Sequence, residues 1–152
     1  AAFSDYNRCT ICMSYVLRVT PQAGEASLAD LAGSQGAIAK APSLPGGPVG
    51  NIGPQLFIRA AEFLPAVQRA FGAADVEGKA STVWPGVVGK QGVVYIEDCY
   101  PTAGDKRMTI KGLYEPPSGD HWDLFDGLRM VSAEEGLRNN SHSGKLWFWK
   151  AA

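Results

Sequence analysis

The sequence has few cysteines, few histidines and no excess of charge of either sign. Its 152 residues include three cysteines, two histidines, 14 basic and 15 acidic side chains, for a formal net charge of −1. A chain without a basic excess does not hold a phosphate backbone by counterion release, so nucleic acid is a poor partner for it. Three cysteines are too few for a disulfide-stapled mini-domain, and the odd count leaves at least one thiol unpaired within the chain.

Long hydrophobic runs are also missing. The longest apolar stretches, such as Gly92 to Ile96, are far shorter than the roughly 20 residues of a membrane-spanning helix. The chain begins Ala1-Ala2-Phe3, without methionine or a recognisable leader, so we expect this end to be processed or trimmed. With 45% apolar residues the chain has enough material for one core and too little length for two ordinary domains. The sequence therefore predicts a single domain over residues 1–152.

Patterns for metals and cofactors are absent as well. Paired Cys-x-x-Cys units and a His-x-x-x-His spacing are both missing, which argues against a structural zinc site. The glycine-rich run at 46–50 contains proline and lacks the lysine that follows a phosphate-binding loop. The sequence therefore predicts neither a metal nor a cofactor.

Hydrophobic periodicity predicts helices in the first half of the chain. Residues 10–19 read as a short, largely buried helix with Asn7 as its N-cap, so that Cys9 lies in the first turn. Residues 54–71 repeat apolar side chains at helical spacing, and Gly72 is a natural stop. The glycine- and proline-rich stretch between the two reads as a long surface loop.

The second half of the chain changes to a β pattern. Residues 92–96 form an apolar, β-branched run suited to a central strand, and residues 108–113 are a candidate for another. The runs 121–125 and 128–131 flank an Asp-Gly pair, which is a strong signal for a hairpin with a two-residue turn. Residues 145–149 close the sheet at the C-terminus. Helices followed by an antiparallel sheet predict an α+β domain.

Cys9 and His121 are the two residues with the clearest chemical potential. A thiol in the first turn of a helix meets backbone N–H groups and the positive end of the helix dipole, which favour the thiolate. A histidine on a nearby strand can complete an ion pair and give a nucleophile that needs no metal. Packing of the helix against the sheet could bring the two together. The alternatives are an inert buried cysteine and a histidine that only makes hydrogen bonds.

The residues around Cys9 resemble a known family. Asn7 to Leu17 reads Asn-Arg-Cys-Thr-Ile-Cys-Met-Ser-Tyr-Val-Leu, which is similar to the nucleophile helix of type VI secretion amidase effectors of family 4, Asn-x-Cys-x-x-x-Met-Ser-x-x-Leu. Residues 21–54 and 98–117 match nothing in that family. Four further blocks resemble it in the same order, namely 57–72, 88–94, 119–127 and 146–149.

The resemblance implies a papain-like, NlpC/P60-type fold, with an N-terminal nucleophile helix packed on a C-terminal antiparallel sheet. It implies a secreted antibacterial effector, delivered to the periplasm or cell wall of rival bacteria, that cuts peptidoglycan peptide stems between D-glutamate and meso-diaminopimelate. Cys9 would be the nucleophile and His121 the general base, later the general acid. A cognate immunity protein would be the protein partner, with no nucleic acid, membrane or cofactor involved.

The third catalytic group departs from the family pattern. With a two-residue turn, Ser132 lies opposite His121, where the family has an aspartate that orients the histidine. Serine can hold a tautomer of the imidazole, but it cannot stabilise the imidazolium with a full charge. Glu134 shares the sheet face with Ser132 and could come opposite the histidine through a bulge. Asp123 also lies on the face of His121, but we expect a neighbour on the same strand to be badly placed to reach the ring, so Ser132 and Glu134 are the candidates.

Cys12 leaves other classes of function open. It lies one turn from Cys9, at the spacing of a thiol–disulfide redox motif at a helix start, so a small oxidoreductase is a rival hypothesis. Against it, no strand of thioredoxin type precedes the motif and no βαβ pattern surrounds it. A disulfide from Cys12 to Cys99 would leave Cys9 free. A non-enzymatic binding domain with an eroded site would fit the missing aspartate.

Overall fold

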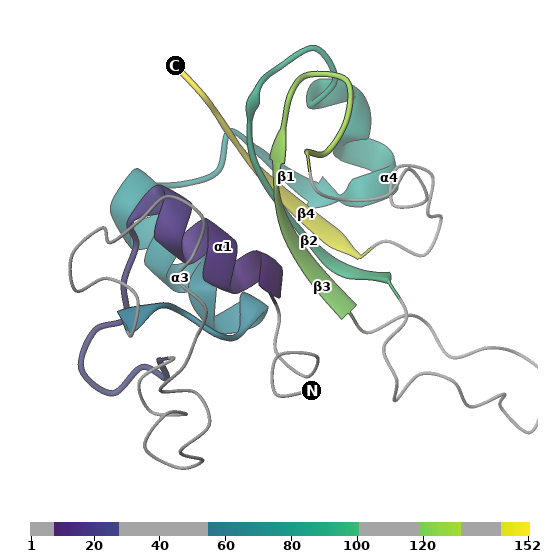
Figure 1. Cartoon of the computed structure of the whole chain (residues 1–152). Coiled ribbons are helices and arrows are strands. Elements are labelled where there is room, and N and C mark those ends of the chain that lie inside the picture. The colour runs from purple at the N-terminus through teal and green to yellow at the C-terminus, as the bar shows by residue number, and fades with distance from the viewer. Residues whose placement is uncertain (1–7, 28–54, 101–118, 132–143) are drawn as a thin grey trace, which may run out of the picture. The chain divides into compact units, whose positions relative to one another are not determined.

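The computed structural model of the protein describes residues 8–27, 55–100, 119–131 and 144–152. The chain divides into two compact units, one ending at Gly72 and one beginning at Ala73 (Figure 1). The described part of the first is helical and that of the second is mainly an antiparallel sheet, which confirms the predicted α+β class. No helix among the described residues is long and apolar enough to cross a membrane. That residues 1–152 form one domain stays a prediction.

Helix α1, Arg8–Leu17, begins two residues before the predicted helix. Cys9 is therefore its second residue and lies in the first turn, as predicted, while the proposed N-cap Asn7 lies outside the described residues. Ile11 and Met13 are buried, and Val16 is exposed. The helix ends at Leu17, and the positive φ of 54° at the next residue, Arg18, turns the chain out of the helical path.

The buried side chain of Ser14 fixes α1 to the rest of the first unit. Its hydroxyl donates to the carbonyl of Val19 at 2.7 Å and accepts the backbone N–H of Phe57 at 3.0 Å. Both partners would otherwise be polar groups in an apolar setting, where a missing hydrogen bond costs stability. The serine of the Met-Ser pair that resembles the effector family thus has a structural role here.

Helix α3, Ala60–Phe71, is shorter than the predicted helix over 54–71. The chain before it is extended: Phe57 forms an isolated bridge with Ser27, and Arg59 has φ −125° and ψ 129°. The predicted stop at Gly72 is confirmed, with φ 81° and its N–H bonded to the carbonyl of Gln68. The buried face of α3 consists of Ala60, Phe63, Ala66 and Val67.

The sheet of the second unit has the strand order β1-β4-β2-β3, with every neighbouring pair antiparallel. Its strands are β1 Val76–Lys79, β2 Gly92–Tyr100, β3 Gly119–Phe125 and β4 Lys145–Lys150. The C-terminal strand β4 therefore lies inside the sheet, between β1 and β2, and the prediction that it closes the sheet was wrong. Its four central residues are all buried. The predicted strand at 108–113 lies outside the described residues.

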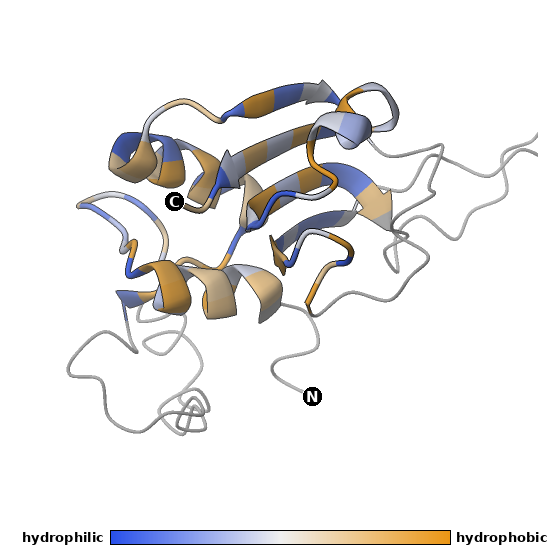
Figure 2. Cartoon of the chain, turned by 90° about the horizontal axis from the view of Figure 1, so that it is seen from above, coloured by the Kyte–Doolittle hydropathy of each residue, from blue (hydrophilic) through white to orange (hydrophobic). Residues whose placement is uncertain are grey.

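The two faces of this sheet are packed differently, and Figure 2 shows apolar and polar residues alternating along the strands. One face is aromatic: the ring centroids of Tyr95 and Trp122 are 4.5 Å apart, those of Tyr95 and Trp147 are 5.2 Å apart, and those of Trp122 and Trp149 are 5.8 Å apart. All four side chains are buried. The stack holds β3, β2 and β4 together through their side chains as well as their backbones.

The opposite face carries an aliphatic core. Val94, Ile96, Leu146 and Phe148 of the strands are buried there. The short helices α4, Ala80–Val83, and η3, Trp84–Gly86, pack against it with their apolar side chains. His121 and Asp123 belong to this face, since they pair with Ile96 and Val94.

The turn after β3 is longer than predicted. Phe125 pairs with Met130 instead of Leu128, so the turn holds four residues and the pairing is displaced by two. The carboxylate of Asp126 explains the longer turn, because its Oδ1 accepts the backbone N–H groups of Leu128 and Arg129, both at 2.8 Å. The predicted two-residue turn was therefore wrong, whereas the pairing of Ser132 with His121 lies outside the described residues and stays a prediction.

Candidate active site

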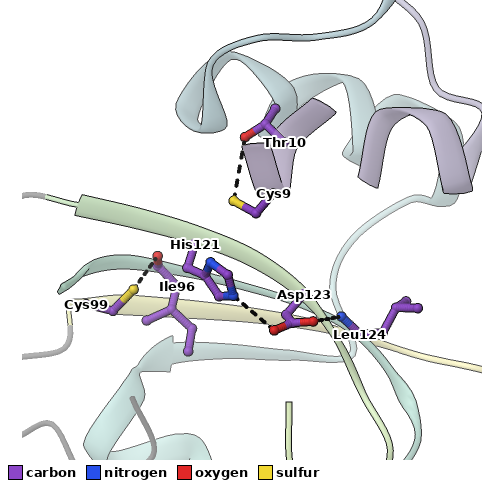
Figure 3. A network of polar contacts seen from close by, with 7 residues as sticks. All are labelled: Cys9, Thr10, Ile96, Cys99, His121, Asp123 and Leu124. Carbon is purple, nitrogen blue, oxygen red and sulfur yellow. Dashed lines mark hydrogen bonds and ion pairs between the residues drawn. The ribbon is translucent and has the colours of Figure 1, made fainter. Parts of the chain in front are cut away.

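Cys9 lies in the first turn of α1, in the first unit (Figure 3). Its side chain is half-buried, and its Sγ lies 4.0 Å from the hydroxyl of Thr10, which is fully buried. The first N–H groups of a helix have no carbonyl partner within the helix and point towards its start. The thiol of Cys9 therefore lies at the end of α1 where backbone N–H groups are exposed.

His121 and Asp123 form a close pair on β3, in the second unit. The ring Nε2 of His121 lies 2.9 Å from Oδ2 of Asp123 (Figure 3), and the two side chains are 14% and 3% exposed. The expectation that a neighbour on the same strand could not reach the ring was wrong. Residues two apart on a strand share a face and are separated by roughly 6.6 Å along the chain. That distance is within the combined reach of an imidazole and a carboxylate that lean towards each other.

The second carboxylate oxygen of Asp123 is also engaged. Its Oδ1 accepts the backbone N–H of Leu124 at 2.8 Å, so each oxygen has a fixed donor. Across the ladder, His121 faces Ile96 and Asp123 faces Val94, and both of these side chains are buried and apolar. A carboxylate in such surroundings interacts with a neighbouring positive charge more strongly than it would in water.

This contact determines which nitrogen of His121 can act as a base. A carboxylate only accepts hydrogen bonds, so Nε2 carries the hydrogen that lies between the two groups. In the neutral ring Nδ1 then holds the lone pair, and Figure 3 shows it on the side of the ring away from Asp123. The arrangement can take a proton on Nδ1 and stabilise the resulting imidazolium through Asp123.

Asp120, the residue before His121 on β3, has a structural role at the bulge of β2. Asp120 accepts the hydroxyl of Tyr95 at 3.0 Å through Oδ2 and the backbone N–H of Asp98 at 3.1 Å through Oδ1. Asp98 has a positive φ of 49° and lies where the register of β2 and β3 shifts. Burial raises the pKa of Glu97, and the charges of Asp120 and Asp98 raise it further. Among the described residues no group of three or more potential ligands could hold a metal ion.

The other predicted residues are placed as follows. Ser132 and Glu134 lie outside the described residues, so both stay predictions. Cys12 is exposed on α1, whereas Cys99 is fully buried on β2 with its Sγ 3.5 Å from the carbonyl of Ile96. The disulfide between Cys12 and Cys99 stays a prediction. Sequence reasoning missed the contact between Asp123 and His121, although the alternation of side chains already placed both on one face.

A protein-family model matches residues 6–149, which is nearly the whole chain. The model is described as Tae4, "Type VI secretion system (T6SS), amidase effector protein 4". The match confirms the family resemblance drawn from the sequence. No curated protein sequence matches the chain significantly.

Three solved structures resemble the chain. The type VI effector Tae4 from Enterobacter cloacae matches with a TM-score of 0.59 and 17% identity, over 96% of this chain and 73% of that one. The Tae4–Tai4 effector–immunity complex from the same organism gives 0.59 and 17%, over 96% and 75%. Tae4 from Salmonella typhimurium, in complex with the immunity protein Tai4 from Enterobacter cloacae, gives 0.54 and 14%, over 96% and 76%. The similarity confirms the predicted papain-like, NlpC/P60-type fold.

Proposed function

The chain belongs to the Tae4 family of type VI secretion system amidase effectors, and from that premise we propose that it cuts peptidoglycan peptide stems between D-glutamate and meso-diaminopimelate. Membership makes the protein a peptidoglycan amidase of the cysteine-peptidase class that is delivered into target bacteria. The bond, the compartment and the residues that act are our proposal. The periplasm is the proposed site of action, because the peptide stems of the cell wall are there.

We assign Cys9 as the nucleophile and His121 as the general base. The observation that carries this assignment is the contact between Nε2 of His121 and the carboxylate of Asp123, which places the lone pair of the neutral imidazole on Nδ1. Cys9 contributes a thiol in the first turn of a helix. Ser132 and Glu134, predicted from the hairpin, stay candidates for orienting the imidazole.

The reaction follows from these roles. His121 takes the thiol proton, and the sulfur of Cys9 attacks the carbonyl carbon of the scissile amide. A backbone N–H group, such as that of Cys9 at the helix start, can donate a hydrogen bond to the oxyanion that forms. The imidazolium gives its proton to the departing amine as the C–N bond breaks, which leaves a thioester. Water then attacks the thioester with His121 again as base, and releases the D-glutamate carboxylate and the free thiol.

Digestion of purified peptidoglycan with the full chain tests the proposal. Wild-type protein should release fragments with a new amine on diaminopimelate and a free D-glutamate carboxyl, as read by mass spectrometry of the muropeptides. Cys9→Ala and His121→Ala should release none, whereas Cys12→Ala, a cysteine substitution on the same helix, should cut normally. An active Cys9→Ala protein would contradict the nucleophile assignment, and cleavage at a different bond would contradict the proposed specificity.

A cognate immunity protein is the proposed protein partner. The relatives in two of the matching structures are bound to the immunity protein Tai4. Co-purification of the chain with a candidate immunity protein, and loss of peptidoglycan cleavage when the two are mixed, are the expected results. The oxidoreductase and the eroded binding domain are not favoured by the family to which the chain belongs.

A further inference from the structure

The carboxylate of Asp123 occupies the position that the orienting group of a cysteine–histidine site needs. We propose that Asp123 is the residue that positions His121 and stands opposite its imidazolium form during catalysis. This inference rests on the proposed function, and it names a positioning residue that the hairpin register did not suggest. Asp123 acts through the imidazole, so it is a positioning residue and His121 remains the base.

The geometry meets the two requirements of such a residue. It must hold the ring nitrogen that does not react, and it must be shielded from water. Oδ2 of Asp123 lies 2.9 Å from Nε2 of His121, and the Asp123 side chain is 3% exposed. The strand opposite offers only Val94 and Ile96 at these two register positions. A full charge is costly in this setting unless it is paired, and the pairing with His121 provides that compensation when the ring is protonated.

A neighbouring carboxylate on the same strand shows the contrast. Asp120 precedes His121, so its side chain lies on the opposite face of β3. Its two oxygens are engaged by the hydroxyl of Tyr95 and the backbone N–H of Asp98, which fixes the bulge of β2. Asp120 therefore has a structural function, whereas Asp123 is directed at the imidazole.

The hydrogen bond from Leu124 makes the contact directional. Because the backbone N–H of Leu124 needs an acceptor, it selects one oxygen of Asp123 and leaves the other for His121. In Asp123→Asn the amide oxygen would stay with Leu124, and the NH₂ group would face Nε2. An NH₂ group donates, so Nε2 would have to accept and the ring hydrogen would move to Nδ1. Nδ1 could then no longer take the thiol proton, and the volume of the side chain would be almost unchanged.

The tautomer of His121 gives a test that does not depend on turnover. The chain has only two histidines, so imidazole ¹⁵N spectra at a pH above the titration of both rings contain two sets of signals. His142→Gln identifies the set that belongs to His121. We expect the Nε2–H form in the wild type and the Nδ1–H form in Asp123→Asn. An Nδ1–H form in the wild type would overturn the proposal even if the Asn variant failed to fold.

Kinetics on soluble peptidoglycan fragments supply the second test. With Asp123→Asn we expect kcat to fall on the order of 10³–10⁴-fold with KM little changed, as for orienting carboxylates of catalytic triads. The matched control is Asp126→Asn, which removes a charge from the turn after β3 and keeps the oxygen that caps Leu128 and Arg129. It should cut at the wild-type rate, and thermal unfolding of both variants checks that they are folded.

The outcomes separate this inference from the proposed function. If Cys9→Ala and His121→Ala are inactive while folded Asp123→Asn keeps kcat within about threefold of the wild type, Asp123 is not the positioning residue. A change of His121 tautomer in Ser132→Ala or Glu134→Gln, with none in Asp123→Asn, would assign the role to the hairpin residues. If the wild type does not cut peptidoglycan, the proposed function fails, and the tautomer result still decides whether Asp123 holds the ring.

Discussion

The helix α1 and the strand β3 hold their proposed catalytic residues in different ways. Cys9 is placed by the backbone of α1. The helix is fixed by the two hydrogen bonds of the Ser14 hydroxyl, five residues further along. His121 is placed by a side chain, the buried carboxylate of Asp123 at 2.9 Å. A thiol needs little orientation because sulfur has no ring plane, whereas an imidazole has two distinct nitrogens and must present the correct one. The position of Cys9 is therefore sensitive to changes in the backbone of α1. The orientation of His121 is sensitive to the chemistry of one neighbouring side chain, that of Asp123.

The largest effect on stability is expected from a substitution in β2, the strand that pairs with β3. Gly92 pairs with Phe125 of β3 and Lys150 of β4, and a Cβ there would collide with the carbonyl oxygen of Trp149 and lie 2.7 Å from the ring of Phe148. Since a backbone oxygen of a central strand cannot move away cheaply, Gly92→Ala should lower the free energy of unfolding by about 3 kcal/mol or more. Urea unfolding followed by circular dichroism measures it.

Gly86→Ala is the matched control for this substitution. A Cβ at Gly86 would only touch the methyl groups of Val76 at 3.8 Å, an ordinary contact distance. We expect a change within about 0.5 kcal/mol. An equally small effect of Gly92→Ala would mean that β2 and β4 are not packed as described, and that His121 does not depend on this strand pairing.

The next largest effect is expected on α1, the helix that carries Cys9. Ser14→Ala removes both hydrogen bonds of the Ser14 hydroxyl, and the N–H of Phe57 and the carbonyl of Val19 lose this partner in a buried position. We expect a loss of about 1–3 kcal/mol in the free energy of unfolding. Ser81→Ala, an exposed serine of α4, is the control and should change little. An unaffected Ser14→Ala protein would show that α1 is fixed by apolar packing alone.

The same contrast explains which features the sequence could predict. The place of Cys9 in a first turn and the stop at Gly72 follow from local rules of helix periodicity and capping, and both are found. The α+β order of elements follows in the same way. These features depend on neighbours within one or two turns, which a single sequence displays.

Three features escaped prediction because they depend on contacts that a linear pattern does not fix. The interior position of β4 is a matter of strand order, which alternation leaves open. The four-residue turn depends on the carboxylate of Asp126 capping two N–H groups instead of the backbone closing a two-residue turn. The contact between Asp123 and His121 depends on rotamers. Alternation places both on one face, but only the side-chain conformations decide that they meet.

A smaller effect is expected from the charge of Glu97 on β2, the strand that pairs with β3. Burial and the nearby charges of Asp120 and Asp98 hold the pKa of Glu97 above its usual value of 4.5, although Lys145 partly offsets this. The folded state therefore binds this proton more tightly than the unfolded state, and the stability that protonation brings is lost as pH rises through the raised pKa. Glu97→Gln should thus stabilise the protein at pH 7 by a few tenths of a kcal/mol, and the gain should disappear below the unfolded-state value.

Denaturant titrations at pH 7 and at pH 4 measure this difference. The control is Glu62→Gln on α3, where the carboxylate is exposed and pairs with Arg59 at 2.8 Å. That variant should give no gain at pH 7, because it removes a favourable partner instead of a repelled charge. A gain from Glu97→Gln that persists at pH 4 would have to come from packing and not from the raised pKa.

The smallest expected effect is that of Cys12→Ala, and it tests whether α1 really positions its thiol through the backbone. Cys12 is exposed one turn from Cys9, so its removal takes away no buried contact area of note. Peptidoglycan cleavage should stay within about twofold of the wild type, since alanine is also the best helix former, and a thiol reductant should have the same effect on both proteins. A loss of more than tenfold, together with disulfide reductase activity that is present in the wild type and absent in the variant, would favour the redox hypothesis. In that case a second sulfur would fix the reactivity of Cys9, and Cys9 and His121 would each depend on a neighbouring side chain.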